Sequence, residues 1–316
     1  STKVPLGFLL VYNLEFGIIG ALITTILSSL VKIIILALMT REKLCGTIKK
    51  NVIKFWFRLS WLTLYMSLFG FIRRLDVLFF SVITGSVSGL AYWGAANAVA
   101  QAVVHASKIN QGMYPKLLNG GKKEYLQENL TYFFYLVFPL ASMVIIFSKP
   151  ALFALNPLYD IASNIVIVLV FSIFQMSITK IFISGLQGIE KVDMNPDATF
   201  KDHLKSKLFF LPTIQNFRAA WYLGILVVTL IYFKSQGVSD LELVFIWAIV
   251  DCISRIPQTL YLYSMIRKEF SPKIKKQIVM KYFIIATIIF GGVFVLMDNM
   301  LTYHISIFQF LPEFMA

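Results

Sequence analysis

The apolar stretches of this 316-residue chain carry six basic side chains but only two carboxylates. The basic residues are Lys32, Arg73, Arg74, Lys180, Arg218 and Arg255, and the carboxylates are Asp76 and Asp251. An ionisable side chain in hydrocarbon costs at least about 2.5–3.5 kcal/mol, so such residues normally face the interior of a helix bundle or a watery cavity. An excess of cations at membrane depth is what the pathway of an anionic substrate would need. The pattern therefore predicts membrane-spanning helices around a cationic interior.

The composition also places the chain among membrane proteins. Hydrophobic residues make up 58% of it and charged residues only 14%, against about 25% in soluble domains. The net charge of +13 falls mostly in short loops between apolar runs, which argues against a nucleic-acid partner.

The sequence carries no signature of catalysis, of a metal site or of a cofactor site. Cys45 and Cys252 form neither a disulfide framework nor a CxxC motif, and the histidines are far apart. We find no nucleophile–base pair, no cluster with metal-ligand spacing and no phosphate-binding loop. We therefore expect a protein that is not an enzyme and has no catalytic residues, no metal and no cofactor.

Apolar runs and their interruptions predict an all-α integral membrane bundle with about eight transmembrane helices. The predicted spans are 16–40, 56–83, 88–114, 131–154, 160–188, 209–233, 241–266 and 278–297. The end of an earlier helix is expected at 4–14 and a short surface helix at 198–207, whereas 300–316 is apolar but too short to assign. Helix breakers lie within or at the ends of spans, where they permit kinks for packing or for gating: Pro139, Gly185, Gly188, Pro257, Gly291 and Gly292.

Lysine and arginine are divided unequally between the two sets of loops. The loops after the first, third, fifth and seventh spans hold 20 of them, and the other set holds only Lys149 and Lys234. Because basic loops stay on the cytoplasmic side, we expect a multi-pass protein of the cytoplasmic membrane with these four loops inside. The loops at 84–88, 148–160 and 234–241 are expected outside.

Two acid–base pairs are spaced to meet on one helix face. Arg73 and Asp76 are three residues apart, and Asp251 and Arg255 are four apart, one turn before Pro257. Each pair is either a neutral staple between helices or part of a binding surface, and the spacing leaves both interpretations open.

The remaining cations have no partner at such a spacing. Arg74 lies about 100° around the helix from Arg73 and is left without a partner on its own helix. Lys32, Lys180 and Arg218 lie nearer the cytoplasmic ends, where a long side chain can reach the interface. We expect one interior surface to be shared by Arg73, Arg74, Asp76, Asp251 and Arg255.

Five segments of the chain, taken in order, carry a family resemblance. They are FGIIGALITTILSSLVKIIILALMTREK, Asp76 with the turn Gly85 to Gly89 and GLAYWGAANAVAQ, then YPKL (114–117), NPLYDIA (156–162) and GLQGIEK (185–191). In this order they resemble flippases of the multidrug/oligosaccharidyl-lipid/polysaccharide (MOP) superfamily, most closely the polysaccharide and lipid-linked oligosaccharide branch. The resemblance covers about residues 5–190, and the rest agrees mainly in helix count.

The resemblance implies a MATE-like fold of two six-helix lobes around a central cavity, often with two trailing helices. It implies alternating-access transport of a glycan linked to a lipid (pyro)phosphate, with membrane lipids and this anionic substrate as partners. Cavity-lining Arg and Lys would hold the phosphate. This role is carried over to Arg73, Arg74, Arg218 and Arg255. The full substrate-binding set that we expect also includes Asp76, Asp251 and Lys180.

The chain departs from the family in length, because five helices of the first lobe have no counterpart. We expect the C-terminal two-thirds of a transporter, or a chain that works with a partner supplying the missing N-terminal lobe. The expected domains are 1–54, the end of the first lobe; 55–266, the second six-helix lobe; and 267–316, a basic loop and trailing helix with an apolar tail.

Three other functions are weighed against a glycolipid flippase. A multidrug exporter of the same fold would need an acidic cavity for its cationic drugs, which the six-to-two excess of cations disfavours. A non-transporting structural subunit of a larger membrane complex is supported by the missing lobe. A membrane-bound glycosyltransferase or lipid-modifying enzyme is weakened by the lack of an acidic metal motif.

Overall fold

A computed structural model describes residues 3–13, 16–41, 50–120, 124–192, 200–272 and 276–298. Every regular element in these ranges is a helix, which confirms the all-α class. Cys45, the basic residues within 42–49, 121–123 and 273–275, and the apolar tail at 300–316 lie outside the described residues. The chain divides into two compact units, Ser1–Trp61 and Leu62–Ala316.

The first unit contains helices α1 (Lys3–Gly7) and α2 (Gly17–Met39), joined through a π-helical turn at Phe8–Asn13. Among the α2 residues whose burial the structure describes, only Gly20 and Thr24 are buried, and the leucines and isoleucines are largely exposed. The Thr24 hydroxyl donates to the Gly20 carbonyl one turn earlier, at 2.8 Å, so no polar group of that side chain is left unpaired. A helix that is apolar on all sides and has few protein neighbours is typical of a membrane span.

The second unit is a bundle of long helices. The chain leaves α4 (Lys50–Thr84), continues through α5 (Val87–Ala100), a 3₁₀ segment η2 (Gln101–Gly112) and α6 (Met113–Leu118), and then enters α7 (Glu124–Ile146). After α8 (Ser148–Leu155) and the 3₁₀ turn η3 (Pro157–Ala162) come the long helices α9 (Ser163–Gly188), α11 (Lys207–Ser235), α12 (Asp240–Phe270) and α13 (Lys276–Asp298). The short helix α10 (Phe200–Lys205) confirms the surface helix predicted at 198–207.

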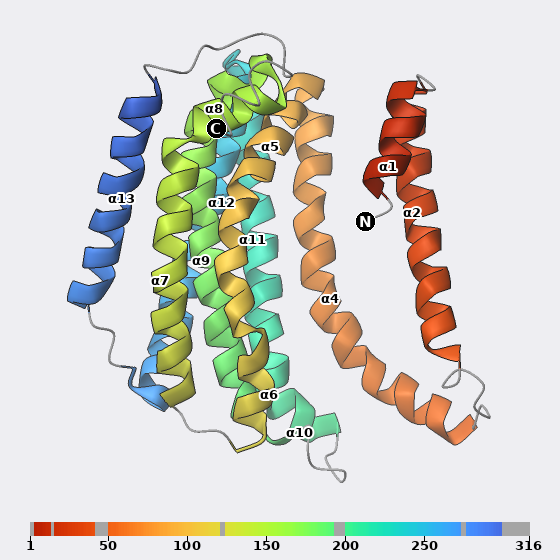
Figure 1. Ribbon diagram of the computed structural model, residues 1–316. Coiled ribbons are helices and arrows are strands. Elements are labelled where there is room, and N and C mark those ends of the chain that lie inside the picture. The colour runs from red at the N-terminus through yellow and green to blue at the C-terminus, as the bar shows by residue number, and fades with distance from the viewer. Residues whose placement is uncertain are drawn as a thin grey trace. The chain divides into compact units, whose positions relative to one another are not determined.

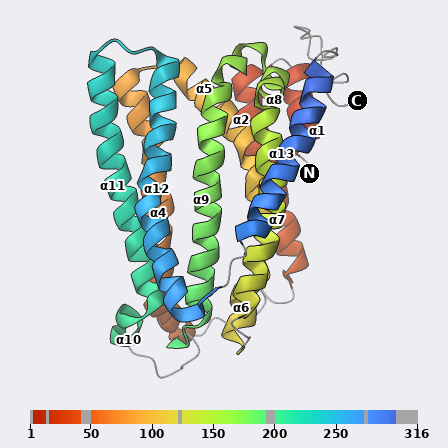
Figure 2. The ribbon, with the colours of Figure 1, turned by 90° about the vertical axis from the view of Figure 1, so that its left-hand side faces the viewer.

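Successive long helices of this second unit run in opposite directions (Figures 1 and 2). Helix α8 and the turn between α11 and α12 lie at one end, and α6 and α10 lie at the other (Figure 2). Lys116, Lys201 and Lys205 are therefore carried at the end opposite Lys149 and Lys234. These lysines are therefore divided between the two ends of the bundle as the charge bias predicts.

Six helices are long and apolar enough to cross a membrane, counted within the described ranges: Ile19–Met39, Glu124–Ile146, Pro157–Gly188, Lys207–Ser235, Asp240–Phe270 and Val279–Met297. They correspond to six of the eight predicted spans, so a multi-span membrane protein is confirmed. The other two, 56–83 and 88–114, are helical but are not among the six. The predicted span 131–154 is wrong at both ends, because the helix begins at Glu124, an acidic residue in its first turn, and ends at Ile146.

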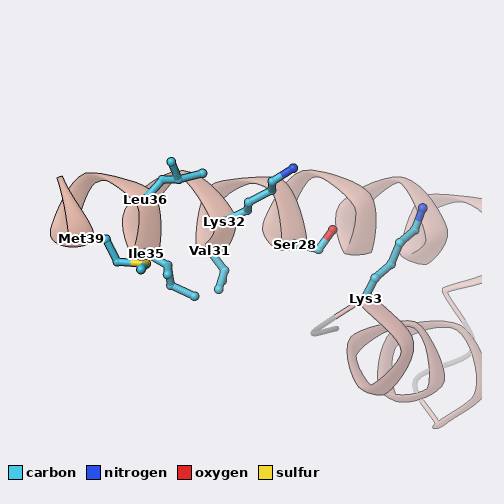
Figure 3. Close-up of a pocket in the computed structure, with 7 residues that line it drawn as sticks. All are labelled: Lys3, Ser28, Val31, Lys32, Ile35, Leu36 and Met39. Atoms are coloured by element: carbon cyan, nitrogen blue, oxygen red, sulfur yellow. The ribbon is translucent and has the colours of Figure 1, made fainter. Parts of the chain in front are cut away.

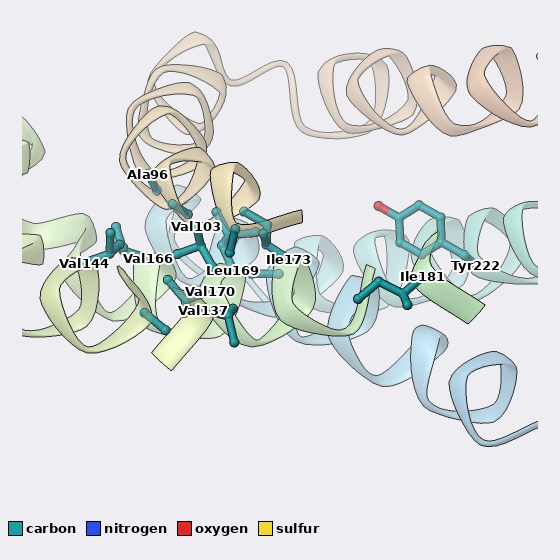
Figure 4. Close-up of a cluster of buried hydrophobic side chains, with 14 of the residues drawn as sticks. Ala96, Val103, Val137, Val144, Val166, Leu169, Val170, Ile173, Ile181 and Tyr222 are labelled. Carbon is teal, nitrogen blue, oxygen red and sulfur yellow. The ribbon is translucent and has the colours of Figure 1, made fainter. Parts of the chain in front are cut away.

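Helix α9 lies at the centre of the bundle and packs against α12, α5, α7, η2 and α6. Figure 4 shows its residues Val166, Leu169, Val170 and Ile173 facing Val137 of α7 and Val103 of η2, with all six side chains buried. Elsewhere in this core Trp247 stacks between Trp93 and Phe80, at ring-centroid distances of 3.8 and 4.8 Å.

Two local features fix how helices in this bundle begin and approach. Ser239 and Glu242 form a reciprocal capping box at the start of α12, which pairs two backbone donors that the helix leaves free. Near the end of α9, a Cβ on Gly188 would lie 2.7 Å from the Cβ of Leu117. The GLQG segment therefore has glycine where α6 comes too close to α9 for any side chain.

Candidate functional site

The buried carboxylate of Asp251 is the centre of a charged network. Arg255 Nη2 lies 2.8 Å from Asp251 Oδ1, and Arg218 Nη2 lies 3.1 Å from the same oxygen. The Ser172 hydroxyl donates to the other oxygen, Oδ2, and accepts from Arg255 Nε at 2.7 Å. Asp251, Arg218 and Arg255 are only 3%, 6% and 4% exposed, so the network is shielded from bulk water.

Helix geometry explains why these side chains meet. Asp251 and Arg255 are one turn apart on α12, so the predicted pairing is confirmed. Ser172 comes from α9 and Arg218 from α11, the two helices that flank α12. Asp251 follows the first residue of α12 by 11 positions, which places the network about 17 Å from that end of a helix about 46 Å long. The network therefore lies in the middle third of the membrane-spanning segment.

Asp76 on α4 is the second buried carboxylate, and it does not pair with Arg73 as the spacing predicted. Its Oδ2 accepts from the Tyr222 hydroxyl at 2.9 Å, and that hydroxyl accepts from Trp247 Nε1 at 2.8 Å. The Arg73 guanidinium is half-buried and points to α9, where Nη1 lies 3.4 Å from Met176 Sδ. Tyr222 of α11 thus makes the contact with Asp76 that the spacing predicted for Arg73.

The charged groups around Asp251 and Asp76 carry a small excess of positive charge, which the half-buried Arg73 contributes. Arg73 interacts electrostatically with Arg255, Asp251 and Asp76. The cluster therefore combines Arg73, Arg218 and Arg255 with two carboxylates, which leaves one net positive charge. Arg218 Nε is buried without a hydrogen-bond partner among the described residues, so this guanidinium has an unused donor.

The structure does not bring the other predicted cations into this cluster. Arg74 is exposed, on a different face of α4 from Asp76, so the expected common surface for all five residues is wrong for Arg74. The reason is the 100° step between neighbouring helical residues, which turns Arg74 away while Arg73 reaches α9. Lys180 is exposed as well, and Lys32 is exposed in the first unit. The cluster therefore holds three cations, of which Arg73 is half-buried, against two buried anions.

Two cavities lie outside the cluster. One, of about 380 Å³, is bordered by η2, α9 and α11 and includes Lys108, Asn110 and Lys180 in its wall. The other belongs to the first unit, has a volume of about 500 Å³ and is mainly apolar. Figure 3 shows its two cations, with Lys3 extending from α1 toward the helix that carries Lys32.

The sequence analysis missed three residues around the two buried carboxylates, namely Ser172, Tyr222 and Trp247. Ser172 gives no signal in an apolar helix, because serine is common there. Tyr222 does give a signal, because it lies four residues after Arg218 and so on the same helix face. In the structure the guanidinium carbon of Arg218 lies 5.6 Å from the centroid of the Tyr222 ring. Trp247 was assigned no role, yet its indole N–H holds the Tyr222 hydroxyl in place.

The described part of the chain holds no group of three or more His, Cys, Asp or Glu side chains arranged for a metal ion. The buried cluster itself offers charge and hydrogen bonding by guanidinium groups. Guanidinium presents a planar fork of donors that matches carboxylate and phosphate oxygens. No protein-family model, no curated protein and no solved structure matches this chain.

Proposed function

We propose that this chain is part of a membrane flippase that moves an anionic lipid-linked glycan, a precursor of an oligosaccharide or polysaccharide, by alternating access. In this proposal the chain is the C-terminal two-thirds of a MOP-type transporter with a MATE-like fold. A first lobe, from the same polypeptide or a partner chain, supplies the other wall of the cavity. The membrane is the cytoplasmic membrane, with the basic ends of the helices inside.

The observation that carries the proposal is the exposure of Arg74, which the predicted span 56–83 places at membrane depth. Arg74 precedes the last residue of α4 by ten positions, which places it about 15 Å from the helix end. A bilayer with headgroups is about 40–45 Å thick, so this depth lies below the headgroups, inside the hydrocarbon. Contact with lipid tails would cost at least about 2.5–3.5 kcal/mol. Arg74 therefore needs water, another protein surface or an anionic ligand beside it.

The cluster behind Arg74 suits an anion that must be both bound and released. Asp251 holds two guanidinium groups, so a phosphate that attracts one of them leaves the carboxylate paired with the other. Charge-assisted hydrogen bonds to phosphate are about twice as strong as neutral ones. Exchange of one arginine between Asp251 and the substrate phosphate would couple binding to a rearrangement of α11 against α12.

Two rival functions are separated by charge and by hydrogen bonding. A multidrug exporter for cations is disfavoured because the buried cluster keeps a net positive charge. A non-transporting structural subunit is favoured by one observation, the mutual satisfaction of Asp251, Arg255 and Ser172, which is also what a static staple between helices requires.

Transport of labelled lipid-linked glycan in inverted membrane vesicles tests the proposal. Vesicles from cells that carry the native gene should move the glycan into the lumen, and vesicles from cells that lack it should not. Complementation with Arg74→Ala should fail if the chain transports, whereas a structural subunit would tolerate this change as long as the complex assembles. Normal movement of the glycan in the absence of the gene would refute the flippase.

A further inference from the structure

The cavity between η2, α9 and α11 has the composition of an anion site. Its wall contains two lysines, Lys108 from η2 and Lys180 from α9, and no carboxylate. Neither lysine forms an ion pair with any residue in the described ranges. Its other polar side chains are hydroxyls and carboxamides: Ser107, Asn110, Gln111, Ser184 and Gln215.

These side chains offer more donors than the surrounding helices use. The ammonium groups of Lys108 and Lys180 and the amide of Gln215 make no hydrogen bond with the described part of the protein. The Asn110 side chain is buried at the wall, and its Oδ1 receives no hydrogen bond from the described residues. A ligand with phosphate oxygens and a neighbouring hydroxyl would complement both the donors and this acceptor.

The position of the cavity fits a lipid headgroup. Lys180 precedes the end of α9 by eight residues, and Gln215 follows the start of α11 by eight, so both lie about 12 Å inside the helix ends. These ends belong to the basic side of the bundle, which carries α6 and α10 (Figure 2). In a bilayer with a hydrocarbon core of about 30 Å, such a depth lies just below the headgroups, within reach of lipid phosphates.

The electrostatic surroundings favour an anion as well. Arg73 and Arg255 of the cluster lie close enough to repel the Lys180 ammonium group, so their positive potential reaches the cavity. The volume of about 380 Å³ falls within the 300–1,000 Å³ usual for ligand sites. Lys108 and Lys180 are both exposed, so a ligand can approach the cavity without a rearrangement of the core.

We propose that this cavity is a phosphate-binding site, separate from the buried arginine cluster, and that Lys108 and Lys180 hold the phosphate group of an anionic lipid headgroup or a free phosphate. Gln215 and Ser184 donate to the remaining phosphate oxygens. In this proposal Lys180 binds a ligand other than the glycolipid phosphate that is proposed for Arg218 and Arg255. It does not depend on transport, because a bound lipid could sit there in a protein of any function.

Binding to the purified protein in detergent tests the site. Native mass spectrometry would compare phosphatidylglycerol with zwitterionic phosphatidylcholine, and calorimetry would titrate inorganic phosphate. We expect Lys108→Met with Lys180→Met to weaken phosphatidylglycerol binding roughly ten-fold or more, the loss expected for hydrogen bonds to a charged group. Lys180→Arg should keep the binding. The matched pair is Lys180→Met alone and Lys201→Met on α10, because each removes one positive charge at the same end of the bundle and only Lys180 lines the cavity.

Each outcome decides one point. If the wild type retains phosphatidylglycerol and only the cavity variants lose it, the ligand is a lipid headgroup. If the wild type binds inorganic phosphate and the same variants abolish that binding, the ligand is a free phosphate. Equal lipid retention by the wild type and the double variant, or an equal loss in Lys201→Met, would overturn the proposal. If the double variant does not keep the wild-type thermal transition, Gln215→Leu serves as the second cavity variant and should weaken binding without any change of charge.

Discussion

Arg255 Nη2 donates to both carboxylate oxygens of Asp251, at 2.8 and 2.9 Å, from one turn further along α12. Arg218 reaches the same carboxylate from α11, and Ser172 reaches it from α9. One carboxylate therefore connects three helices and forms ion pairs with two guanidinium groups. This relationship makes Asp251 the residue on which both the stability and the charge balance of the site depend.

Replacing Asp251 with Asn should strongly destabilise the protein. The change leaves two buried guanidinium groups without a counter-charge, and breaking a buried ion pair typically costs about 3–5 kcal/mol. Thermal unfolding of the purified protein in detergent measures the loss. Glu128→Gln, which removes one negative charge from an exposed position on α7, is the matched control and should change stability by less than about 0.5 kcal/mol. Equal transitions for the two variants would show that Asp251 is not the centre of the network.

The two arginines of the network should differ in their tolerance of lysine. Arg255 uses Nε and Nη2 to contact Ser172 and both oxygens of Asp251, which a single ammonium cannot reproduce. Arg218 contacts Asp251 through one Nη2 atom, and its Nε has no described partner. We expect Arg255→Lys to lower the unfolding temperature more than Arg218→Lys does. The reverse order, measured in the same detergent, would contradict the geometry.

Removal of the Tyr222 hydroxyl should leave two buried polar groups unpaired. Tyr222→Phe takes a donor from Asp76 and an acceptor from the Trp247 indole. An unsatisfied buried group costs about 1–3 kcal/mol, so a clear loss of thermal stability is expected. Tyr232→Phe on the same helix is the control, because that side chain is 59% exposed and should be neutral. A neutral Tyr222→Phe would mean that water replaces the hydroxyl.

A side-chain contact was predictable from the sequence only where both residues lie on the same helix. Asp251 and Arg255 are one turn apart on a single helix, so their pairing follows from spacing alone. Arg73 and Asp76 have an equally good spacing, yet Tyr222 from α11 takes the carboxylate and Arg73 turns toward Met176. That choice depends on packing between helices distant in sequence, which periodicity does not encode. The burial of Arg218 was unpredictable for the same reason, because its partner lies on α12.

Helix boundaries show the same limit. Apolar runs located six spans that the structure contains, because length and hydropathy are local properties. The continuous span predicted at 131–154 is instead divided at Phe147 into α7 and α8. Pro157 and the Asn156 side chain, which accepts from the Leu158 amide at 2.9 Å, begin the next segment as a 3₁₀ turn.

The ends of the bundle should be distinguishable by cysteine labelling. In a variant whose Cys45 and Cys252 are replaced, Ser235→Cys at the end of α11 should react with an impermeant maleimide in intact cells. Lys201→Cys on α10 should react only after permeabilisation, because the basic ends are expected in the cytoplasm. The opposite pattern would reverse the proposed orientation.

Arg74 separates transport from stability, because its side chain is exposed and the structure gives it no hydrogen bond within the described ranges. Arg74→Ala should therefore leave the unfolding temperature nearly unchanged, as surface substitutions do.

If Arg74 faces the substrate phosphate, the same variant should lower the rate of glycan movement in vesicles by more than about ten-fold, the value of one charge-assisted contact. Arg74→Lys should keep part of the rate, since lysine supplies the charge but not the planar fork. Lys32→Ala should be mild, because an exposed lysine on α2 can extend its ammonium group to the interface. Wild-type glycan movement by Arg74→Ala, at equal protein levels, would remove Arg74 from the substrate path and would leave water or another protein surface as its neighbour.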